Sequence, residues 1–350
     1  MLKFKIFNNI NNECEKIWRE FEINSINDYF QTFDYHKELI NNYNLQSLNI
    51  IVIFFDKEPI ALFPLYVKKY FLIKILMFLG TKYSDYCNPI ISPKFINYID
   101  NQNFIKIWQE IINKVDNFDL FFFNNQLSAI NNFQNPIVHY LNSKKFSSIY
   151  LINLPSKFDF YKKSILEQNK EFHYEIHRTL LKKEKLKKNH QLEFEMKILN
   201  KSDFKLEELV KNKIKELKKK KRESNLETKI VNLYNNLNKK DENKFLMATL
   251  KVDDEIISAC FCIQFNNKLY YYMPIILSKK YEKYKIGKIL LLEIINWCIE
   301  MNIVIFDFGL GAEKYKKYFS NVCLNLFRFY KFNSLKGFIA LLFMKLILKF

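Results

Sequence analysis

Glycine is scarce in this sequence, and long hydrophobic runs are missing. Only 5 of the 350 residues are glycine, so a glycine within a motif is harder to dismiss as an ordinary turn residue. No stretch of roughly 18 uncharged apolar residues occurs, and even residues 338–350 contain Lys345 and Lys349. A membrane-spanning helix is therefore not expected. Residues 1–12 lack the apolar region and cleavage site of a secretion signal, and no repeat of roughly 20 to 50 residues is visible.

The 6 cysteines are scattered along the chain. Without an export signal, we expect reduced thiols and a cytoplasmic protein. Cys260 and Cys262 fall on the same face of one predicted strand, which favours two core residues over metal ligands or a redox pair. His173 and His177 are four residues apart on a predicted helix, but they do not form H-E-x-x-H and lack an obvious third ligand. We therefore expect no metal.

The length of 350 residues suggests about two domains. Strand-like runs mixed with helical patterns predict an α/β (α+β) fold. We expect an N-terminal lobe over residues 1–153 and a C-terminal lobe over residues 154–334. The second lobe would carry a basic helical insertion at about residues 161–240. Residues 335–350 would form an amphipathic C-terminal helix.

Local patterns predict most of the elements. Asp56-Lys57-Glu58 separates two β-rich runs and marks a hairpin, and Asp253-Asp254 and Asn266-Asn267 separate three runs of an antiparallel meander. We read residues 151–155 as a connection. Residues 1–12 read as a first strand followed by a turn, and the other predicted strands cover residues 120–123, 192–198, 303–308 and 324–331. The predicted helices cover residues 12–21, 104–115, 161–188 (a basic pair), 201–221, 227–238, 286–301 and 312–319.

Residues 281–291, YEKYKIGKILL, place a glycine at the start of a helix. Gly287 would let the backbone approach a phosphate closely, while unpaired N–H groups and the positive end of the helix dipole attract the anion. Lys285 and Lys288 would add positive charge. The alternative is that Gly287 simply occupies a turn.

Residues 307–316, DFGLGAEKYK, follow a short apolar strand, where side chains commonly reach a cleft. Acyl transfer from a thioester needs a neutral amine, stabilisation of the oxyanion and a proton for the departing thiolate. The Tyr315 hydroxyl can supply that proton, Lys316 can stabilise the oxyanion or hold a phosphate, and Asp307 can accept or orient the amine proton. The alternative is a capped loop in which Asp307 pairs with Lys316.

The order of meander, glycine-containing helix start and following strand resembles the acyl-coenzyme A core of the GNAT superfamily of N-acyltransferases. Residues 307–316 resemble the D-F-x-x-G-x-E-x-Y-K signature of its CelD-like branch, associated with cellulose and other surface polysaccharides. The resemblance covers roughly residues 25–330. It implies coenzyme A contacts at Tyr284, Lys285, Gly287, Lys288 and Gly311. Where that branch commonly has Pro-Gly, this chain has Ile286-Gly287, and its loop holds less glycine than the superfamily's usual one.

The same resemblance assigns acceptor-binding residues in both halves of the chain. Ser84-Asp85-Tyr86 lies where the CelD-like branch usually has a Ser-Asp-Tyr turn, and His177-Arg178 would open a basic helix. Similarity to Fem-type aminoacyl transferases implies two facing GNAT-like lobes, with Asp85 binding the acceptor amine. An ordinary turn explains Ser84-Asp85-Tyr86 equally well. The substrate-binding residues implied are Ser84, Asp85, Tyr86, Arg178 and Glu313.

Positive charge adds further candidate partners. The chain has 55 Lys and Arg against 37 Asp and Glu, a net charge of +18, part of which fits an AT-rich coding bias. Lysine runs at residues 182–188 and 211–222 are solvated helix faces by default, or contacts to coenzyme A phosphate, transfer RNA or anionic lipid. Residues 336–350 are apolar with dispersed lysines, as in a helix lying on a membrane surface, or they cap the core.

We therefore expect an N-acyltransferase that moves an acyl group, acetyl in the first instance, from acyl-CoA to the amine of an amino sugar, nucleotide sugar or surface-polysaccharide precursor. Transfer would be direct, without a covalent enzyme intermediate. The alternatives are a Fem-type enzyme that uses aminoacyl-tRNA and a non-catalytic GNAT-fold factor for polysaccharide biosynthesis or export. The expected location is cytoplasmic, peripheral on the inner face of the membrane if residues 336–350 bind lipid.

Overall fold

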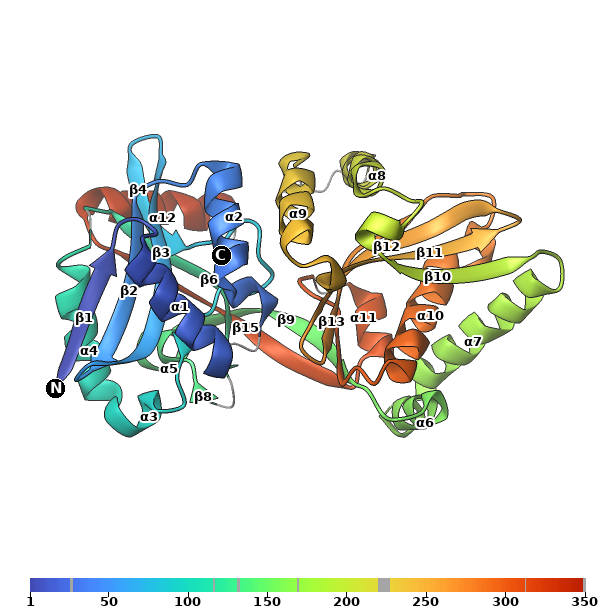
Figure 1. Cartoon of the computed structure of the whole chain (residues 1–350), viewed down its shortest axis with the longest axis horizontal. Helices are drawn as coiled ribbons and strands as arrows, with labels where there is room; N and C mark the ends of the chain where they lie inside the picture. Colours follow the sequence, from blue (N-terminus) through green and yellow to red (C-terminus); the bar gives the residue numbers. More distant parts are fainter. Residues whose placement is uncertain are drawn as a thin grey trace. The chain divides into compact units, whose positions relative to one another are not determined.

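The computed structural model describes residues 1–25, 28–115, 117–130, 133–168, 170–219, 227–311 and 313–348. The end of the lysine run at residues 220–222, Ala312 and residues 349–350 of the predicted C-terminal helix lie outside this part of the chain. The described chain divides into two compact units. Unit 1 comprises Met1–Ser147 and Asn325–Phe350, and unit 2 comprises Ser148–Leu324. We describe each unit by itself (Figure 1).

Unit 1 is a mixed sheet with helices, in the strand order β1-β2-β3-β4-β6-β15. Its strands are β1 (Leu2–Phe7), β2 (Leu48–Phe55), β3 (Glu58–Tyr70), β4 (Ile73–Phe78), β5 (Ile90–Ile91), β6 (Leu120–Leu127), β7 (Ala129–Ile130), β8 (Phe133–Gln134) and the unit 1 part of β15 (Val322–Phe332). Its helices are α1 (Asn12–Asn24), η1 (Tyr29–Gln31), α2 (Phe33–Tyr43), α3 (Phe95–Tyr98), α4 (Asn101–Ile112), α5 (Pro136–Tyr140) and α12 (Leu335–Leu348).

Unit 2 repeats this arrangement in the strand order β10-β11-β12-β13-β14-β9. Its strands are the unit 2 part of β9 (Lys144–Asn153), β10 (Leu192–Ile198), β11 (Phe245–Val252), β12 (Glu255–Phe265), β13 (Lys268–Ile276) and β14 (Ile305–Asp307). Its helices are α6 (Phe158–Gln168), α7 (Lys170–Lys187), η2 (Leu199–Lys201), α8 (Leu206–Lys219), α9 (Lys229–Lys240), η3 (Glu242–Lys244), η4 (Glu282–Tyr284), α10 (Ile286–Glu300) and α11 (Lys314–Phe319).

Both units place a parallel strand beside an antiparallel meander. In unit 1, β2, β3 and β4 form the meander and β6 runs parallel to β4; in unit 2, β11, β12 and β13 form it and β14 runs parallel to β13. The meander turns follow their sequence, since Asp253, Asp254 and Asn266 have left-handed backbone angles with φ of 50°, 67° and 52°. The predicted hairpin and meander are therefore confirmed.

Two strands differ from the sequence-based reading. Residues 151–155 were predicted as a connection, but Leu151, Ile152 and Asn153 pair with β14 in antiparallel register. That prediction is wrong because Ile152 is buried and paired with Phe306 of β14, which lies more than 150 residues away in the chain. Local sequence patterns do not show such a pairing. In addition, β15 pairs with β6 of unit 1 from Leu326 to Phe332.

Each unit has its own apolar core. In unit 1, Phe63, Phe78 and Phe123 from the sheet pack with Trp108 of α4. In unit 2, α10 packs against β11, β12 and β13, and α7 packs against α10. Cys260 and Cys262 are fully buried in this second core, as predicted. Within the described chain, no helix is both long and apolar enough to cross a membrane.

Candidate active site

Asp307 ends β14, which lies between β13 and β9 in unit 2. Its side chain is 1% exposed. Oδ1 accepts a hydrogen bond of 2.8 Å from the backbone N–H of Gly309, and Oδ2 lies 3.9 Å from Nζ of Lys268. A buried carboxylate is stable only when it is paired and hydrogen-bonded. Asp307 therefore fixes the first turn of the loop that follows the strand.

Two glycines allow the shape of that loop. Gly309 has φ of 64° and Gly311 has φ of 104°, a region that side chains disfavour. A Cβ atom on Gly311 would lie 2.5 Å from Oε2 of Glu313. Glu313 stands at the N-cap position of α11, and its backbone carbonyl accepts a hydrogen bond of 2.9 Å from the N–H of Lys316. The motif glycine at 311 is thus required by its backbone angle, while the Glu313 carboxylate would have to move to make room for a side chain.

Lys316 holds the same loop from its other end. Its side chain is 5% exposed, and Nζ donates to the carbonyl oxygen of Leu310 at 2.5 Å and to that of Gly309 at 3.5 Å. Nζ also forms an ion pair of 3.1 Å with Glu313. The pairing considered from the sequence, Asp307 with Lys316, is replaced by two others: Asp307 lies beside Lys268, and Lys316 pairs with Glu313.

Tyr315 is half-buried on α11, with its ring edge-on to Phe308 at 6.3 Å. Burial raises the pKa of Tyr315 well above its ordinary value, and the nearby charge of Glu313 adds to this. Its hydroxyl makes no hydrogen bond to another residue of the described chain. The phenol therefore stays protonated near neutral pH and has a proton to donate.

The N-terminus of α10 combines two lysines with a carboxylate from α7. Nζ of Lys285 and of Lys288 lie 2.6 and 2.5 Å from Oε1 of Glu175. Burial raises the pKa of Glu175, but the hydrogen bonds from the two lysines outweigh it and hold that pKa below its usual value. Within the described chain, the N–H groups of Ile286 and Gly287 have no acceptor, as is usual in a first helical turn.

Gly287 has an ordinary helical backbone, so what glycine provides here is the space that a side chain would fill. A Cβ atom there would lie 3.2 Å from Cδ1 of Ile276, a side chain that is 47% exposed. The left-handed residue at this turn is Lys285, with φ of 59°. Tyr284, just before it, is buried. This turn presents two lysines and two backbone donors at one point, which is suited to an anion.

The predicted acceptor residues of unit 1 lie mostly in the core. Ser84 is buried, with Oγ 3.0 Å from the Tyr35 hydroxyl, and Tyr86 packs edge-on to Phe30 at 6.2 Å. Asp85, between them, is half-buried. Ser84 and Tyr86 are thus held in the core, and their predicted substrate-binding roles stay predictions, as does that of the less buried Asp85. Its proposed contact with an amine held by unit 2 stays a prediction.

Arg178 is exposed on α7, one turn beyond Glu175. The sequence placed His177-Arg178 at the start of a helix, but α7 begins at Lys170. That prediction is wrong because helix-forming residues continue on both sides of the pair. Two contacts were not predicted from the sequence. Lys268 lies 39 residues before its partner Asp307 in the chain, and Glu175 lies 110 residues before its partner Lys285.

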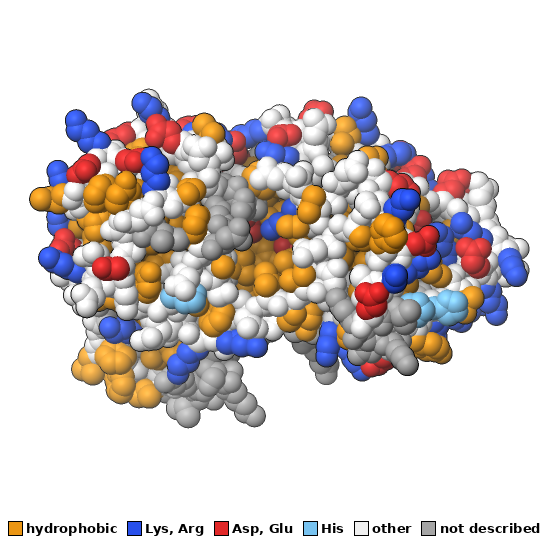
Figure 2. All heavy atoms as spheres, turned by 90° about the horizontal axis from the view of Figure 1, so that it is seen from below, with side chains coloured by type: hydrophobic (Ala, Val, Ile, Leu, Met, Phe, Trp, Pro, Cys, Tyr) orange, Lys and Arg blue, Asp and Glu red, His pale blue; other side chains and the backbone are white. Residues whose placement is uncertain are grey.

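A shallow hollow of about 330 Å³ lies between α6 and α7 of unit 2. Its lining residues are Asp159, Lys162, Lys163, His173, Ile176, His177 and Leu180. Histidine and lysine atoms lie side by side at the right of Figure 2. The His173 and His177 rings are parallel at 6.4 Å. The predicted catalytic and coenzyme-binding residues do not line this hollow. No cluster of three metal-ligating side chains occurs among the residues that the structure describes.

Comparison with family models gives a match to the acetyltransferase (GNAT) domain. The match covers residues 177–317. The matched segment includes β11 to β14, α10 and the loop from Asp307 to Lys316, and it covers less than half of the chain. No curated protein sequence matches the chain.

Solved structures show that the GNAT-like architecture extends over both units. The crystal structure of FemX aligns with a TM-score of 0.59 at 8% identity, over 98% of this chain and 99% of that chain. A tandem GNAT protein from the clavulanic acid biosynthesis pathway aligns with a TM-score of 0.50 at 7% identity, over 95% and 99%. A conserved protein of unknown function from Bacteroides thetaiotaomicron aligns with a TM-score of 0.53 at 10% identity, over 93% and 99%. The expected two-lobed GNAT-like α/β fold is confirmed.

Proposed function

We propose that this protein is an N-acyltransferase that moves an acyl group, acetyl in the simplest case, from acyl-CoA to an amine on an amino sugar, nucleotide sugar or surface-polysaccharide precursor. The GNAT domain over residues 177–317 supports acyl transfer. The polysaccharide assignment rests on the likeness of residues 307–316 to the CelD-like motif. The observation that carries the proposal is the N-terminus of α10, where two lysines already hold an anion.

The donor set at this turn fits a pyrophosphate. Lys285 and Lys288 converge on one oxygen of Glu175, and the N–H groups of Ile286 and Gly287 are unpaired within the described residues. Phosphate oxygens favour charged amines together with backbone donors at a helix start. We infer that the pyrophosphate of acyl-CoA takes the place of the Glu175 carboxylate, which acts as an internal competitor.

The chemistry needs one bond formed and one broken. The neutral amine nitrogen attacks the thioester carbonyl carbon, the carbon–sulfur bond breaks, and the sulfur leaves as a thiolate that takes a proton. Tyr315 supplies that proton from its hydroxyl, which has no hydrogen-bond partner among the described residues. The proton released by the amine passes to solvent or to a base of the acceptor site. No covalent intermediate on the protein is required.

Asp307 and Lys316 act as positioning residues in this proposal. Each uses its charged group to hold the backbone of the loop, Asp307 at Gly309 and Lys316 at Leu310. Lys316 is therefore not available to stabilise an oxyanion while the loop keeps this conformation. The acceptor-binding roles of Ser84, Asp85, Tyr86, Arg178 and Glu313 stay predictions.

Thermal-shift measurements with acetyl-CoA and longer acyl-CoA thioesters test the donor, because binding stabilises the folded state by RT ln(1 + [L]/Kd). Release of free thiol in the presence of a panel of amino sugars tests the transfer. Glu175→Gln removes the competing charge, and we expect about tenfold tighter acyl-CoA binding, equivalent to about 1.4 kcal/mol. Glu171→Gln on the same helix is the matched control. Absence of both acyl-CoA binding and thiol release would overturn the proposal.

A second candidate is a transferase that uses aminoacyl-tRNA. Lys185, Lys187 and Lys188 are exposed at the end of α7, and such a row suits a phosphate backbone. Filter binding of transfer RNA that weakens steeply with salt, together with no response to acyl-CoA, would favour this candidate over the first.

A further inference from the structure

The β3–β4 hairpin of unit 1 presents bulky apolar side chains to solvent. Tyr70 pairs with Ile73, which leaves Phe71 and Leu72 as the two residues of the turn. Phe71 is 95% exposed and Leu72 is 79% exposed. Phe71 also has φ of 52°, an unusual angle for a large side chain. A turn of this kind ordinarily holds Asn, Asp or Gly, so these residues serve something other than the turn.

Lysines surround this tip. Lys68 and Lys69 precede it on β3, and Lys74 follows it on β4. Nζ of Lys68 lies 4.8 Å from the centre of the Tyr70 ring. Residues 68–75 contain three lysines and no acidic residue, so this segment carries only positive charge. Apolar side chains at the tip can enter the lipid tails while the neighbouring lysines contact anionic headgroups.

Helix α12 extends the apolar surface beside the hairpin. It packs on β4 and β6 through one side, while Leu335, Phe338, Ile339 and Leu342 remain 40 to 76% exposed. Phe332 at the end of β15 is 47% exposed and packs edge-on to Phe338 at 5.2 Å. In Figure 1 the hairpin extends at the top of unit 1 and α12 crosses beside its arms.

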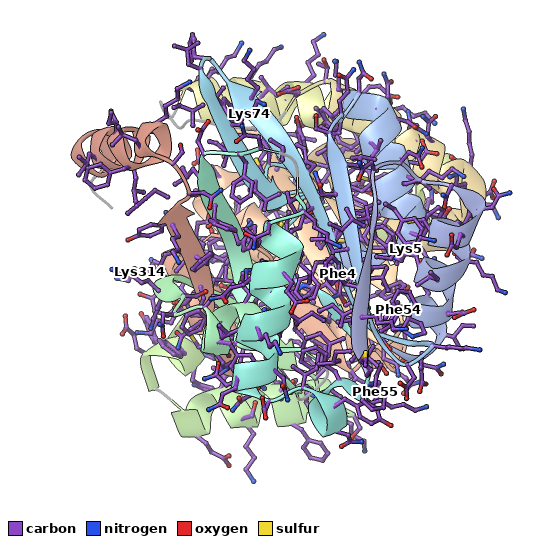
Figure 3. The ribbon with its side chains drawn as sticks, turned by 90° about the vertical axis from the view of Figure 1, so that its left-hand side faces the viewer. Phe4, Lys5, Phe54, Phe55, Lys74 and Lys314 are labelled. Atoms are coloured by element: carbon purple, nitrogen blue, oxygen red, sulfur yellow. The ribbon has the colours of Figure 1, made fainter. Side chains whose placement is uncertain are left out.

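Asp119 fastens the hairpin and α12 to each other. Its Oδ2 accepts a hydrogen bond of 2.9 Å from the backbone N–H of Lys74, and its Oδ1 accepts one of 2.6 Å from the hydroxyl of Ser334. Gly337 crosses so close that a Cβ atom there would lie 1.8 Å from the Asp119 carbonyl oxygen. Figure 3 labels Lys74 on the hairpin, with the α12 ribbon nearby.

These contacts fix the distance between the two apolar features. A strand advances about 3.3 Å per residue, so the tip at Phe71 lies roughly 10 Å along β4 from the point where α12 is attached. The tip and the helix therefore belong to one rigid part of unit 1. Lys336 on α12 is exposed and adds another positive charge.

We propose that the β3–β4 hairpin tip and the exposed side of α12 form a docking surface for an anionic lipid membrane. Charge complementarity selects this occupant, because the apolar residues are accompanied by lysines and the chain carries a net charge of +18. The tip is also a projecting turn, which can enter a lipid layer, whereas a stable protein interface needs a broad complementary face. The inference does not depend on the acyltransferase proposal.

Co-sedimentation of the full chain with vesicles tests this surface. The two vesicle types are phosphatidylcholine alone and equal parts of phosphatidylcholine and phosphatidylglycerol. We expect binding to the anionic vesicles, weakening as salt screens the lysines. The double variant Phe71→Ser/Leu72→Ser should bind about tenfold more weakly or worse, because both side chains lose their burial in lipid. Lys68→Gln/Lys69→Gln should lose about 25-fold on anionic vesicles, at about fivefold per charge.

The matched control is Ile23→Ser, which removes another exposed apolar side chain of unit 1, 80% exposed on α1. It should bind like the unchanged protein. Lys68 is half-buried and the other substituted residues are exposed, and unchanged urea midpoints would show that folding is preserved. Equal binding of the tip variant and the unchanged protein would overturn the proposal, as would absence of binding to the anionic vesicles. A dimer in sedimentation velocity that the tip variant abolishes, without vesicle binding, would reassign the surface to a second copy of the chain.

Discussion

At the scale of single residues, Tyr315 is the proton donor of the proposed reaction. Phe at this position keeps the contact with Phe308 and removes only the hydroxyl. We expect Tyr315→Phe to lower the turnover rate by about 10² to 10⁴-fold, the range for loss of a positioned proton donor. Acyl-CoA binding should be unchanged, because the hydroxyl acts on the thiolate and not on the donor's phosphates. Thiol release measures the first quantity and calorimetry the second.

The control for this variant is Tyr318→Phe, one turn along α11. The Tyr318 hydroxyl lies 3.2 Å from Oε1 of Glu171, and it has no part in the proposed proton transfer. Its removal should leave turnover near that of the unchanged protein. Similar losses in both variants would indicate that α11 is merely disturbed, and no loss in Tyr315→Phe would remove Tyr315 from the mechanism.

His36 makes unit 1 sensitive to acid. It is fully buried against Trp18 at 5.0 Å, with Nδ1 3.0 Å from the Thr32 carbonyl oxygen. Burial lowers the pKa of His36 to about 4, although the hydrogen bond to Thr32 acts the other way. The unfolded chain has a histidine pKa of about 6.5 and binds a proton first as pH falls. Folding stability is therefore complete above pH 6.5 and declines as pH drops toward 4, by about 3 kcal/mol.

Urea unfolding at several pH values between 7 and 4 checks this prediction. Carboxylates titrate in the same range, so the informative quantity is the difference between the unchanged protein and His36→Gln. Glutamine can keep a hydrogen bond to Thr32 and carries no titrating group, and it should flatten the decline. Equal slopes in the two proteins would refute the role of His36.

At the scale of elements, two glycines in the candidate site have different roles. Gly311→Ala places a side chain at φ of 104° and a Cβ atom 2.5 Å from Glu313. We expect a loss of about 1–3 kcal/mol in unfolding free energy. Gly287→Ala keeps a helical backbone and meets only the exposed side chain of Ile276, so its stability should change by less than about 0.5 kcal/mol.

Chemical denaturation and calorimetry separate the two variants. Gly287→Ala should weaken acyl-CoA binding while leaving stability unchanged, since the added methyl group stands where a phosphate would approach the backbone. Gly311→Ala should lower stability. Normal acyl-CoA binding by a folded Gly287→Ala protein would place the phosphates away from the α10 N-terminus.

Most elements were predictable because their signals are local. The Asp253-Asp254 and Asn266-Asn267 turns carry the residues that tolerate left-handed angles, and the apolar run over residues 286–301, which is free of proline, marks α10. By contrast, β9 carries little signal in residues 151–155, since only its pairing with β14 reveals it. The roles of Lys285 and Lys316 were also unpredictable, because Glu175 and the loop carbonyls reach them only through folding.

At the scale of the whole molecule, unit 1 is built from two distant segments. Its strand β6 pairs with residues 326–332, and the Phe146 ring lies 4.3 Å from the guanidinium carbon of Arg328. Residues 1–147 alone would therefore leave the edge of β6 unpaired. We expect this fragment to lack a cooperative urea transition, and residues 148–324 to retain one.

A fusion of residues 1–147 to residues 325–350 through a short flexible linker should restore cooperative unfolding to unit 1. Circular dichroism during urea titration distinguishes the three proteins. A sigmoidal transition in the 1–147 fragment itself would show that β15 and α12 are dispensable for the unit.

The sequence by itself determined the turns, the helices with apolar periodicity, the alternation of strand and helix that defines the fold class, and the two motifs that point to acyl transfer. These depend on backbone preferences and side-chain spacing within a few residues. Only the tertiary structure decided that Glu175 meets Lys285 and Lys288, that Lys316 holds a loop, and that residues 326–332 complete unit 1. Such contacts join residues far apart in the chain, and their positions follow from the packing of whole elements rather than from local preference.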